Sequence, residues 1–122
     1  MAIKAEPNTL DPVTSGLVQE TYVETAIFDG LLQYDSREQL VPDLAMVVPT
    51  QQNGGISKDG KTIVFHLRHG VRWQDGQPFT SADVAFTYEL YINPKTNGFY
   101  RQTYRRITRI DTPDQYTAVL HL

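Results

Sequence analysis

The sequence predicts an α+β fold with mostly antiparallel strands and two main helices. Residues 62–68 alternate between apolar and polar side chains, which is typical of a half-buried strand. Asn53-Gly54 and Asp59-Gly60 are dipeptides that favour tight hairpin turns, and such turns join antiparallel neighbours. Residues 80–92 form a largely apolar run that begins at a capping residue and stops before Asn93-Pro94, as a helix does.

The N-terminal part of the chain predicts a helix over residues 15–31, after an extended lead at residues 1–9 and a turn through Pro12. Gly30 supplies a stop near the end of this helix. The apolar residues that recur at helical spacing are Leu17 or Val18, Tyr22, and Ala26 with Ile27. They define one apolar stripe along the helix.

Short strands are predicted on both sides of the turn signals. Residues 31–35 predict a strand, and the segment between Pro42 and Pro49 is too short for more than one helical turn. Residues 105–122 predict two strands joined by a turn at 112–115. The side chains that share one face are Ile63, Phe65 and Leu67 in the strand at 62–68, and Tyr116, Ala118, Leu120 and Leu122 in the last strand.

The start of the helix at 80–92 has a specific chemistry. Thr80 or Ser81 is a natural N-cap, because a hydroxyl can accept a hydrogen bond from a free amide of the first turn. Asp83 stands at the third helical position, where its carboxylate can imitate a shorter capping box. Trp73 precedes this helix in a polar loop, and we interpret it as an aromatic anchor of the loop to the core, not as a ligand platform.

Composition argues against several classes of function. The chain has 122 residues, a net charge of −3 and no cysteine, so it carries neither disulfides nor the charge pattern of a nucleic-acid-binding protein. The locally basic segment 101–109 is interpreted as the solvated face of a strand. Apolar runs stay shorter than the ~18 residues of a membrane span. Residues 1–10 lack the pattern of a signal peptide, so either the protein is cytosolic or an export signal has been removed.

Catalytic and metal-binding patterns are scarce. We predict no enzyme, no cofactor and no metal site, because the phosphate-binding, dinucleotide-binding and nucleophile motifs are missing. The histidines His66, His69 and His121 are scattered, which does not suit a metal site. Turns and caps account for most of the aspartates that could form a catalytic pair, namely Asp29, Asp35, Asp43, Asp75 and Asp83.

A resemblance to a known family rests on the segment "GKTIVFHLRHGVRWQDGQPFTSADVAFTYE". It resembles the signature of the extracellular solute-binding proteins of family 5, the oligopeptide-, dipeptide- and nickel-binding receptors of ABC importers. The pattern is a DGK turn, an aromatic-rich strand that ends in LR, and a W-x-DG-x-P step into a helix. The upstream "TLDPVTSG", "AIFDGLLQYD" and "LVPDLA" are also similar to the family's opening, so the resemblance covers residues 9–122.

The resemblance implies a fragment of a two-lobed, periplasmic-binding-protein-like (type II) fold, because family members are several times longer than 122 residues. Residues 1–30 would begin the first lobe. Residues 31–122 would form an extra subdomain of that lobe, incomplete at its C-terminus. The second lobe would lie beyond this sequence.

The resemblance also implies where a solute would bind. In family members, the loop and first helical turn after "LDP" border the ligand cleft. The matching positions here are Thr14, Ser15, Gly16, Leu17 and Val18. An ordinary helix start is the alternative interpretation of these residues. The aromatic residues that follow the signature helix, Phe99, Tyr100 and Tyr104, can also approach the cleft.

By this resemblance, the expected function is capture of oligo- or dipeptides for delivery to an ABC permease in the membrane. Receptors of nickel chelates or oligosaccharides within the family are alternatives, and so is a free-standing interaction domain related to this subdomain. The resemblance implies a periplasmic or extracellular protein, with a lipid anchor as one option. The 122-residue chain alone is expected to self-associate, either through the helix at 15–30 or through the strand at 116–122.

Overall fold

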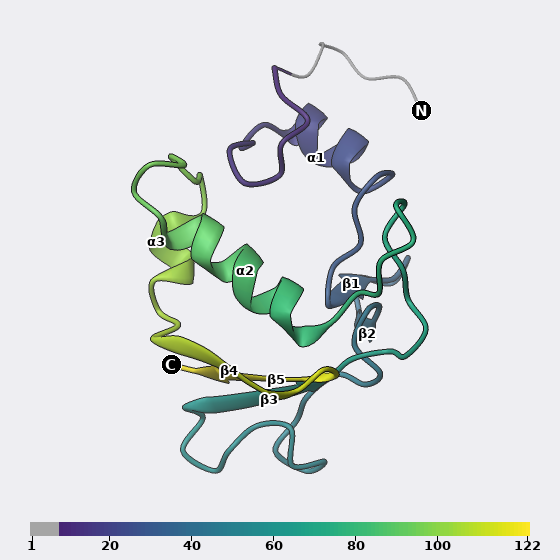
Figure 1. Ribbon diagram of the computed structural model, residues 1–122, viewed down its shortest axis with the longest axis vertical. Helices are drawn as coiled ribbons and strands as arrows, with labels where there is room; N and C mark the ends of the chain where they lie inside the picture. The colour runs from purple at the N-terminus through teal and green to yellow at the C-terminus, as the bar shows by residue number, and fades with distance from the viewer. Residues whose placement is uncertain (1–7) are drawn as a thin grey trace. The chain divides into compact units, whose positions relative to one another are not determined.

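The structure is a computed structural model that describes residues 8–122, so the predicted lead at residues 1–7 lies outside the described part. The chain divides into two compact units (Figure 1). Unit 1 combines the residues up to 29 with residues 88–106, and unit 2 combines residues 30–87 with residues 107–122. The predicted division into 1–30 and 31–122 concerns the lobes of a larger receptor and stays a prediction.

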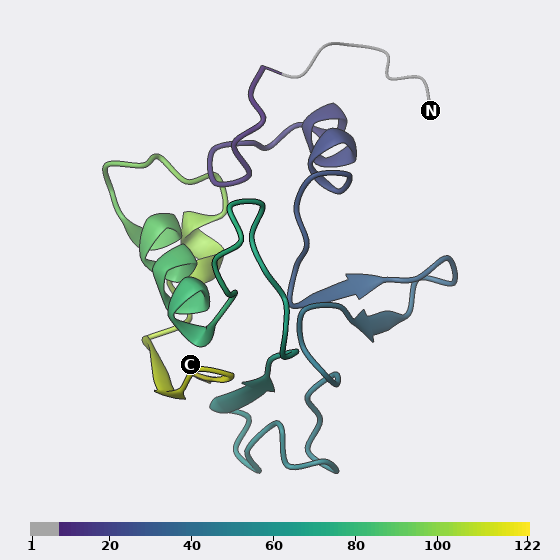
Figure 2. The same ribbon diagram turned by 45° about the vertical axis from the view of Figure 1, so that its right-hand side comes forward.

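Unit 2 contains two antiparallel sheets. β1 (Leu32–Tyr34) and β2 (Leu40–Pro42) form a hairpin, which is clearest in Figure 2. The second sheet has the order β3-β5-β4. Its strands are β3 (Thr62–His66), β4 (Arg109–Asp114) and β5 (Thr117–His121). Every pairing between these strands is antiparallel, which confirms the predicted α+β class with antiparallel strands.

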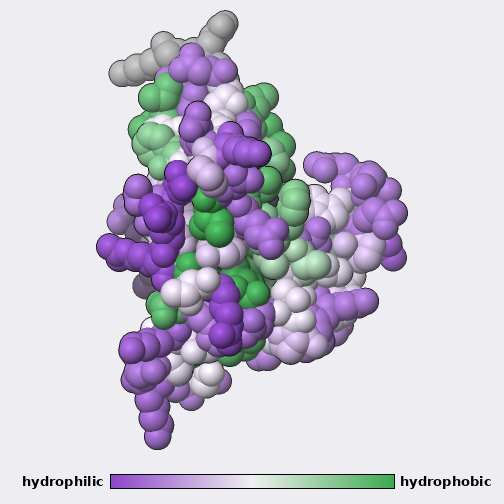
Figure 3. Space-filling model, turned by 60° about the vertical axis from the view of Figure 1, so that its left-hand side comes forward, coloured by the Kyte–Doolittle hydropathy of each residue, from purple (hydrophilic) through white to green (hydrophobic). Residues whose placement is uncertain are grey.

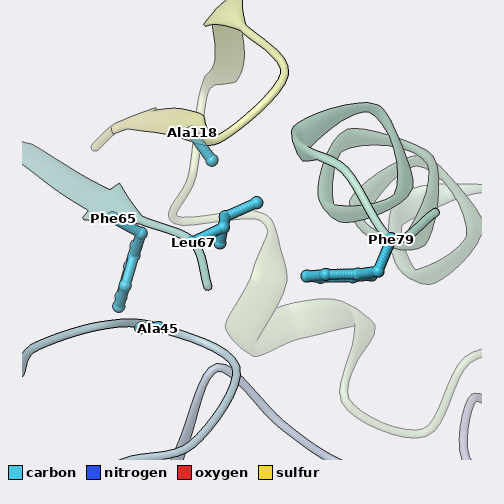
Figure 4. Packing of buried hydrophobic residues seen from close by; sticks show 5 residues of the cluster. All are labelled: Ala45, Phe65, Leu67, Phe79 and Ala118. Carbon is cyan, nitrogen blue, oxygen red and sulfur yellow. The ribbon is translucent and has the colours of Figure 1, made fainter. Parts of the chain in front are cut away.

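The apolar core of unit 2 lies on one face of the β3-β5-β4 sheet. Its buried members are Ala45, Phe65, Leu67, Phe79 and Ala118 (Figure 4). Ile63, Tyr116 and Leu120 pack against this cluster as partly buried neighbours. The strand faces predicted from alternation are therefore confirmed, except that Leu122 is exposed. The turn between β4 and β5 comes later than predicted, because β4 extends to Asp114 and only Gln115 and Tyr116 form the turn.

Helix α2 (Ser81–Ile92) begins where the sequence predicts, and Asp83 takes its predicted capping role. The predicted acceptance of a first-turn amide by the Thr80 or Ser81 hydroxyl is wrong, because both hydroxyls act as donors. The Asp83 carboxylate accepts the backbone N–H of Thr80 at 2.7 Å and the Thr80 hydroxyl at 3.1 Å. The bond from the Thr80 N–H is the return half of a capping box. Ser81 is buried, and its hydroxyl donates to the backbone carbonyl of Asp114, so it secures the helix to the end of β4.

Trp73 is less buried than predicted. Its ring contacts Phe79 edge-on, with centroids 5.9 Å apart, but 46% of the residue is exposed. The loop that carries it is held by main-chain bonds, among them Trp73 N–H to the Gln77 carbonyl at 2.9 Å. The loop therefore does not depend on a buried indole ring.

Unit 1 contains α1 (Val18–Glu24) and α3 (Arg101–Tyr104). The predicted helix at 15–31 is therefore too long. After Glu24 the chain tightens into turns, in which Ala26 N–H donates to the Val23 carbonyl and Ile27 N–H to the Glu24 carbonyl. The side chain of Tyr22, part of the predicted apolar stripe, lies outside the described part. The strand interpretation of 101–109 is also wrong, because this segment begins with α3 and only its last residue, Arg109, enters a strand.

Candidate functional site

The five predicted site residues, 14–18, lie in unit 1 between a turn and the start of α1. Thr14 ends the turn and is exposed, whereas Ser15 is buried and Gly16 is partly buried. Leu17 and Val18 are exposed by 42% and 68%. The structure thus brings together a short stretch of backbone with two apolar side chains open to solvent. We refer to residues 12–18 as the LDP loop.

Asp11 shapes the first half of the LDP loop. Its side-chain Oδ1 accepts the Val13 N–H at 2.9 Å. Its main-chain carbonyl accepts the N–H groups of Thr14 at 3.1 Å and Ser15 at 3.0 Å. An aspartate that bonds the amide two residues later is the usual way in which such a side chain nucleates a turn. The "LDP" sequence therefore specifies a local turn with its own hydrogen bonds.

Glu20 holds the second half of the LDP loop. Its Oε2 accepts the N–H groups of Gly16 and Leu17, both at 3.0 Å, and its Oε1 accepts the N–H of Asn8 at 3.1 Å. Only 2% of this residue is exposed. The bonds from Leu17 and Gly16 hold the pKa of Glu20 below its usual value. Sequence reasoning did not single out Glu20, although a glutamate at the third helical position is a recognised capping signal.

A second segment, residues 91–104, supports the LDP loop within unit 1. The Phe99 N–H donates to the Val13 carbonyl at 3.0 Å, and the Tyr91 hydroxyl donates to the Pro12 carbonyl at 3.0 Å. The rings of Tyr91 and Tyr104 stack with centroids 4.1 Å apart. Burial raises the pKa of Tyr91 to about 12, so its hydroxyl keeps its proton at any physiological pH.

The three aromatic residues predicted to approach the cleft, Phe99, Tyr100 and Tyr104, do not form one patch. The Phe99 and Tyr100 rings meet edge-on with centroids 5.1 Å apart, and both are substantially exposed. Tyr104 is instead engaged in the stack with Tyr91, and burial raises its pKa. Phe99 is thus the aromatic residue with a direct main-chain bond to the LDP loop. Hydrophobic residues reach the molecular surface in several places in Figure 3.

The chemistry of this site suits recognition. The N–H groups of residues 14–17 are engaged with Asp11 and Glu20, and the Thr14 hydroxyl donates to the Asp11 carbonyl at 3.4 Å. The loop therefore offers a solute backbone carbonyl groups and the exposed apolar side chains of Leu17 and Val18. Among residues 8–122, no three histidine, aspartate or glutamate side chains gather in a way that could hold a metal ion. In the same range, no helix is both long enough and apolar enough to cross a membrane.

Two features of unit 2 lie outside this site. An open depression is lined by Met46, Val71 and residues 68–70. The Asp111 carboxylate forms an exposed ion pair with Arg109 at 3.1 Å and a hydrogen bond with His121 Nε2 at 2.8 Å. The hydrogen bond from Arg109 and, less strongly, that from His121 lower the pKa of Asp111. Exposed pairs of this kind contribute little to stability.

Comparisons with known proteins agree on one family. The model of the bacterial extracellular solute-binding proteins, family 5 Middle, matches residues 39–122. A putative ABC transporter peptide-binding protein of Brucella ovis is 38% identical over 96 residues, which is 78% of this chain and 17% of that protein. The solved structure of AgaA from A. tumefaciens with agropinic acid has a TM-score of 0.85 at 35% identity. That similarity covers 96% of this chain and 22% of AgaA.

A second solved structure, NikZ from Campylobacter jejuni in complex with Ni(L-His), has a TM-score of 0.86 at 29% identity and covers 98% of this chain. The chain spans 17% of the Brucella protein, 22% of AgaA and 23% of NikZ. The family model matches well over half of the chain, and it includes the signature helix α2 and both strands that end the sequence. The chain belongs to the bacterial extracellular solute-binding proteins, family 5.

Proposed function

We propose that this chain is part of the substrate-binding component of an ABC importer, which captures peptides and delivers them to a membrane permease. The LDP loop contributes to solute binding through Thr14, Ser15, Gly16, Leu17 and Val18. The observation that carries this proposal is the combination of a fixed backbone with exposed side chains at Leu17 and Val18. Preorganised backbone groups lower the ordering cost of binding.

Peptides are the proposed solute class because the similar Brucella protein is named as peptide-binding. Agropinic acid and Ni(L-His) are the ligands of two structural neighbours, so the test must distinguish binding of peptides from binding of agropinic acid or of a nickel chelate. The function we propose involves no bond making. We also propose an exported protein, lipid-anchored or free, in which residues 1–30 begin the first lobe and residues 31–122 form its extra subdomain.

The test uses the full-length gene product that contains this chain. Calorimetry with an equimolar pool of di- to nonapeptides should show binding, whereas histidine with Ni²⁺ and agropinic acid should not. Val18→Asp places a charge on the exposed loop and should weaken peptide binding about tenfold or more. Val47→Asp is the matched control, since Val47 is also exposed but belongs to unit 2.

Each alternative has its own outcome. Binding of the nickel chelate alone would replace the peptide proposal with a metal-chelate receptor. Binding of none of the probes, by a protein that remains folded, would favour an oligosaccharide receptor or the free-standing interaction domain. If Val18→Asp binds peptide as tightly as the wild type does, the LDP loop is not part of the solute-binding site.

We further propose that the 122-residue chain by itself self-associates, because Leu17, Val18 and Ile27 are exposed on or beside α1. Light scattering at micromolar concentration should show a dimer, and Val18→Asp should shift it toward the monomer. A monomer at all concentrations would contradict this proposal.

A further inference from the structure

Gly16 is the residue of the LDP loop that has no room for a side chain. A Cβ atom added there would lie 2.4 Å from two ring carbons of Phe99, Cδ2 and Cε2, and 2.8 Å from Cγ. Contacts below about 3 Å require one group to move. The backbone of Gly16 has no positive φ angle, unlike that of Gly54 or Gly60. A glycine is therefore needed at position 16 for space and not for conformation.

Phe99 is held at its backbone while its ring covers Gly16. Its N–H donates to the Val13 carbonyl, three residues before Gly16. The preceding residue is also tightly enclosed, because a Cβ on Gly98 would lie 3.1 Å from the Tyr91 carbonyl oxygen and 3.5 Å from Val13 Cγ1. Yet 61% of Phe99 is exposed. The part of its ring that does not contact Gly16 is thus open to solvent beside the predicted solute-binding residues.

Tyr91 provides the second connection between the two segments. Its hydroxyl donates to the Pro12 carbonyl, and its ring is supported by the stack with Tyr104. Residues 12–16 are consequently fixed by Tyr91 at one end and by Phe99 at the other. Neither contact was expected from the sequence, since the residues joined are about 80 positions apart.

We propose that Phe99 is a positioning residue for the solute-binding loop: its ring, fitted onto Gly16, sets the path of residues 13–17 with Tyr91 as a second anchor. This inference rests on the function proposed above. It adds that residues 91–99 determine affinity although they lie far from the LDP loop in sequence. Replacing Gly16 by alanine should act through Phe99, and removing the Phe99 ring should relieve that effect.

The first measurement needs no solute. An aromatic ring on Gly16 shifts the resonances of its α-protons, so these should differ in the NMR spectrum between the wild-type chain and Phe99→Leu. Phe86→Leu is the matched control, because Phe86 is also exposed but belongs to unit 2. Unchanged Gly16 resonances in Phe99→Leu would overturn the inference.

The second measurement is a double-mutant cycle in the full-length protein, with the tightest peptide from the pool as the probe. Gly16→Ala should weaken binding by about tenfold. Gly16→Ala combined with Phe99→Ala should bind as Phe99→Ala alone does, a non-additivity that a merely structural role would not produce. Phe99→Leu should restore part of the affinity lost in Phe99→Ala. Thermal unfolding checks that each variant is folded.

The outcomes separate the inference from the proposed function. Additive losses in the cycle overturn the positioning role. If Val18→Asp weakens binding while the Gly16 and Phe99 variants bind as wild type, the positioning role alone fails. If Val18→Asp also binds as wild type, the loop is not the solute site and both proposals fail.

Discussion

The two units bury different kinds of side chain. Among the described residues, the five buried hydrophobic side chains all belong to unit 2. Unit 1 instead buries Ser15, Glu20 and Glu24, two of which are carboxylic acids. Apolar packing is non-directional and indifferent to pH, whereas a carboxylate that accepts backbone amides requires both its geometry and its charge. Glu20 meets this requirement with three backbone amides, whereas the buried Oε1 of Glu24 has no hydrogen-bond partner among the described residues. The comparison indicates that unit 2 is held by packing, and that directed hydrogen bonds to Glu20 hold the loop of unit 1.

The largest expected effect tests the packing of unit 2. Leu67→Ala should lower the free energy of unfolding by about 2–5 kcal/mol, because Leu67 is fully buried and a cavity would remain. Leu40→Ala is the control, since Leu40 is largely exposed in the same unit. Chemical denaturation followed by the fluorescence of Trp73, the one tryptophan of the chain, measures both variants. A cost below about 1 kcal/mol would show that the cluster is not a packed core.

Trp73→Ala should have a smaller effect, about 1–2 kcal/mol. A buried tryptophan would cost about 3–5 kcal/mol, but the Trp73 ring is half-exposed and meets Phe79 edge-on. Denaturation followed by circular dichroism measures the change, with the more exposed Tyr34→Ala as the control. A loss near 5 kcal/mol would mean that the indole is part of the core.

Asp83→Ala should cost about 1 kcal/mol, the usual cost of a lost helix cap. The variant removes the acceptor of the Thr80 N–H and hydroxyl at the start of α2. Glu89→Ala, on an exposed position of the same helix, should be close to neutral. The two variants would be compared by thermal unfolding. Equal effects would show that the helix start is not stabilised by this bond.

Lowering the pH should loosen the Glu20-bonded loop of unit 1. Of the four effects predicted here, this one should change the free energy of global unfolding least. The folded-state pKa of Glu20 lies below its ordinary value of 4.5, so the stabilisation from its three amide bonds is complete above that value and declines as the pH falls through the folded pKa. The protection of the Gly16 amide against exchange, relative to its intrinsic exchange rate at the same pH, should therefore fall below about pH 4.5. In Glu20→Gln this pH dependence of protection should disappear.

The effect of low pH on unit 1 must be measured with a probe inside that unit, because carboxylates of unit 2 also have lowered pKa values. Hydrogen bonds lower the pKa of Asp59, Asp111 and Asp114. The fluorescence of Trp73 reports on their unit, whereas the Gly16 amide reports on unit 1. If both signals change together at every pH, the two units do not differ in the way proposed.

Local rules predicted unit 2 well and unit 1 poorly. Alternation identified the core face of β3, and the capping pattern identified α2 to within one residue, because both depend on neighbours in sequence. The length of α1 was overestimated because apolar spacing alone continues the helix, whereas the chain after Glu24 tightens into turns through the Ala26 and Ile27 amides. The support of the LDP loop by Tyr91 and Phe99 is non-local, so no periodicity could predict it.

The strand order β3-β5-β4 has a consequence for the chain during its synthesis. β3 pairs through one edge with nearby residues, as Ile56 and Ile63 show, but its other edge pairs with β5, where Phe65 faces Ala118. At translation rates of roughly 5–20 residues per second, that edge stays open for a few seconds after β3 has emerged. An apolar strand with a free edge is prone to pair with another chain in that interval. The interval between the synthesis of β3 and that of β5 is therefore the stage at which this chain is most open to mispairing.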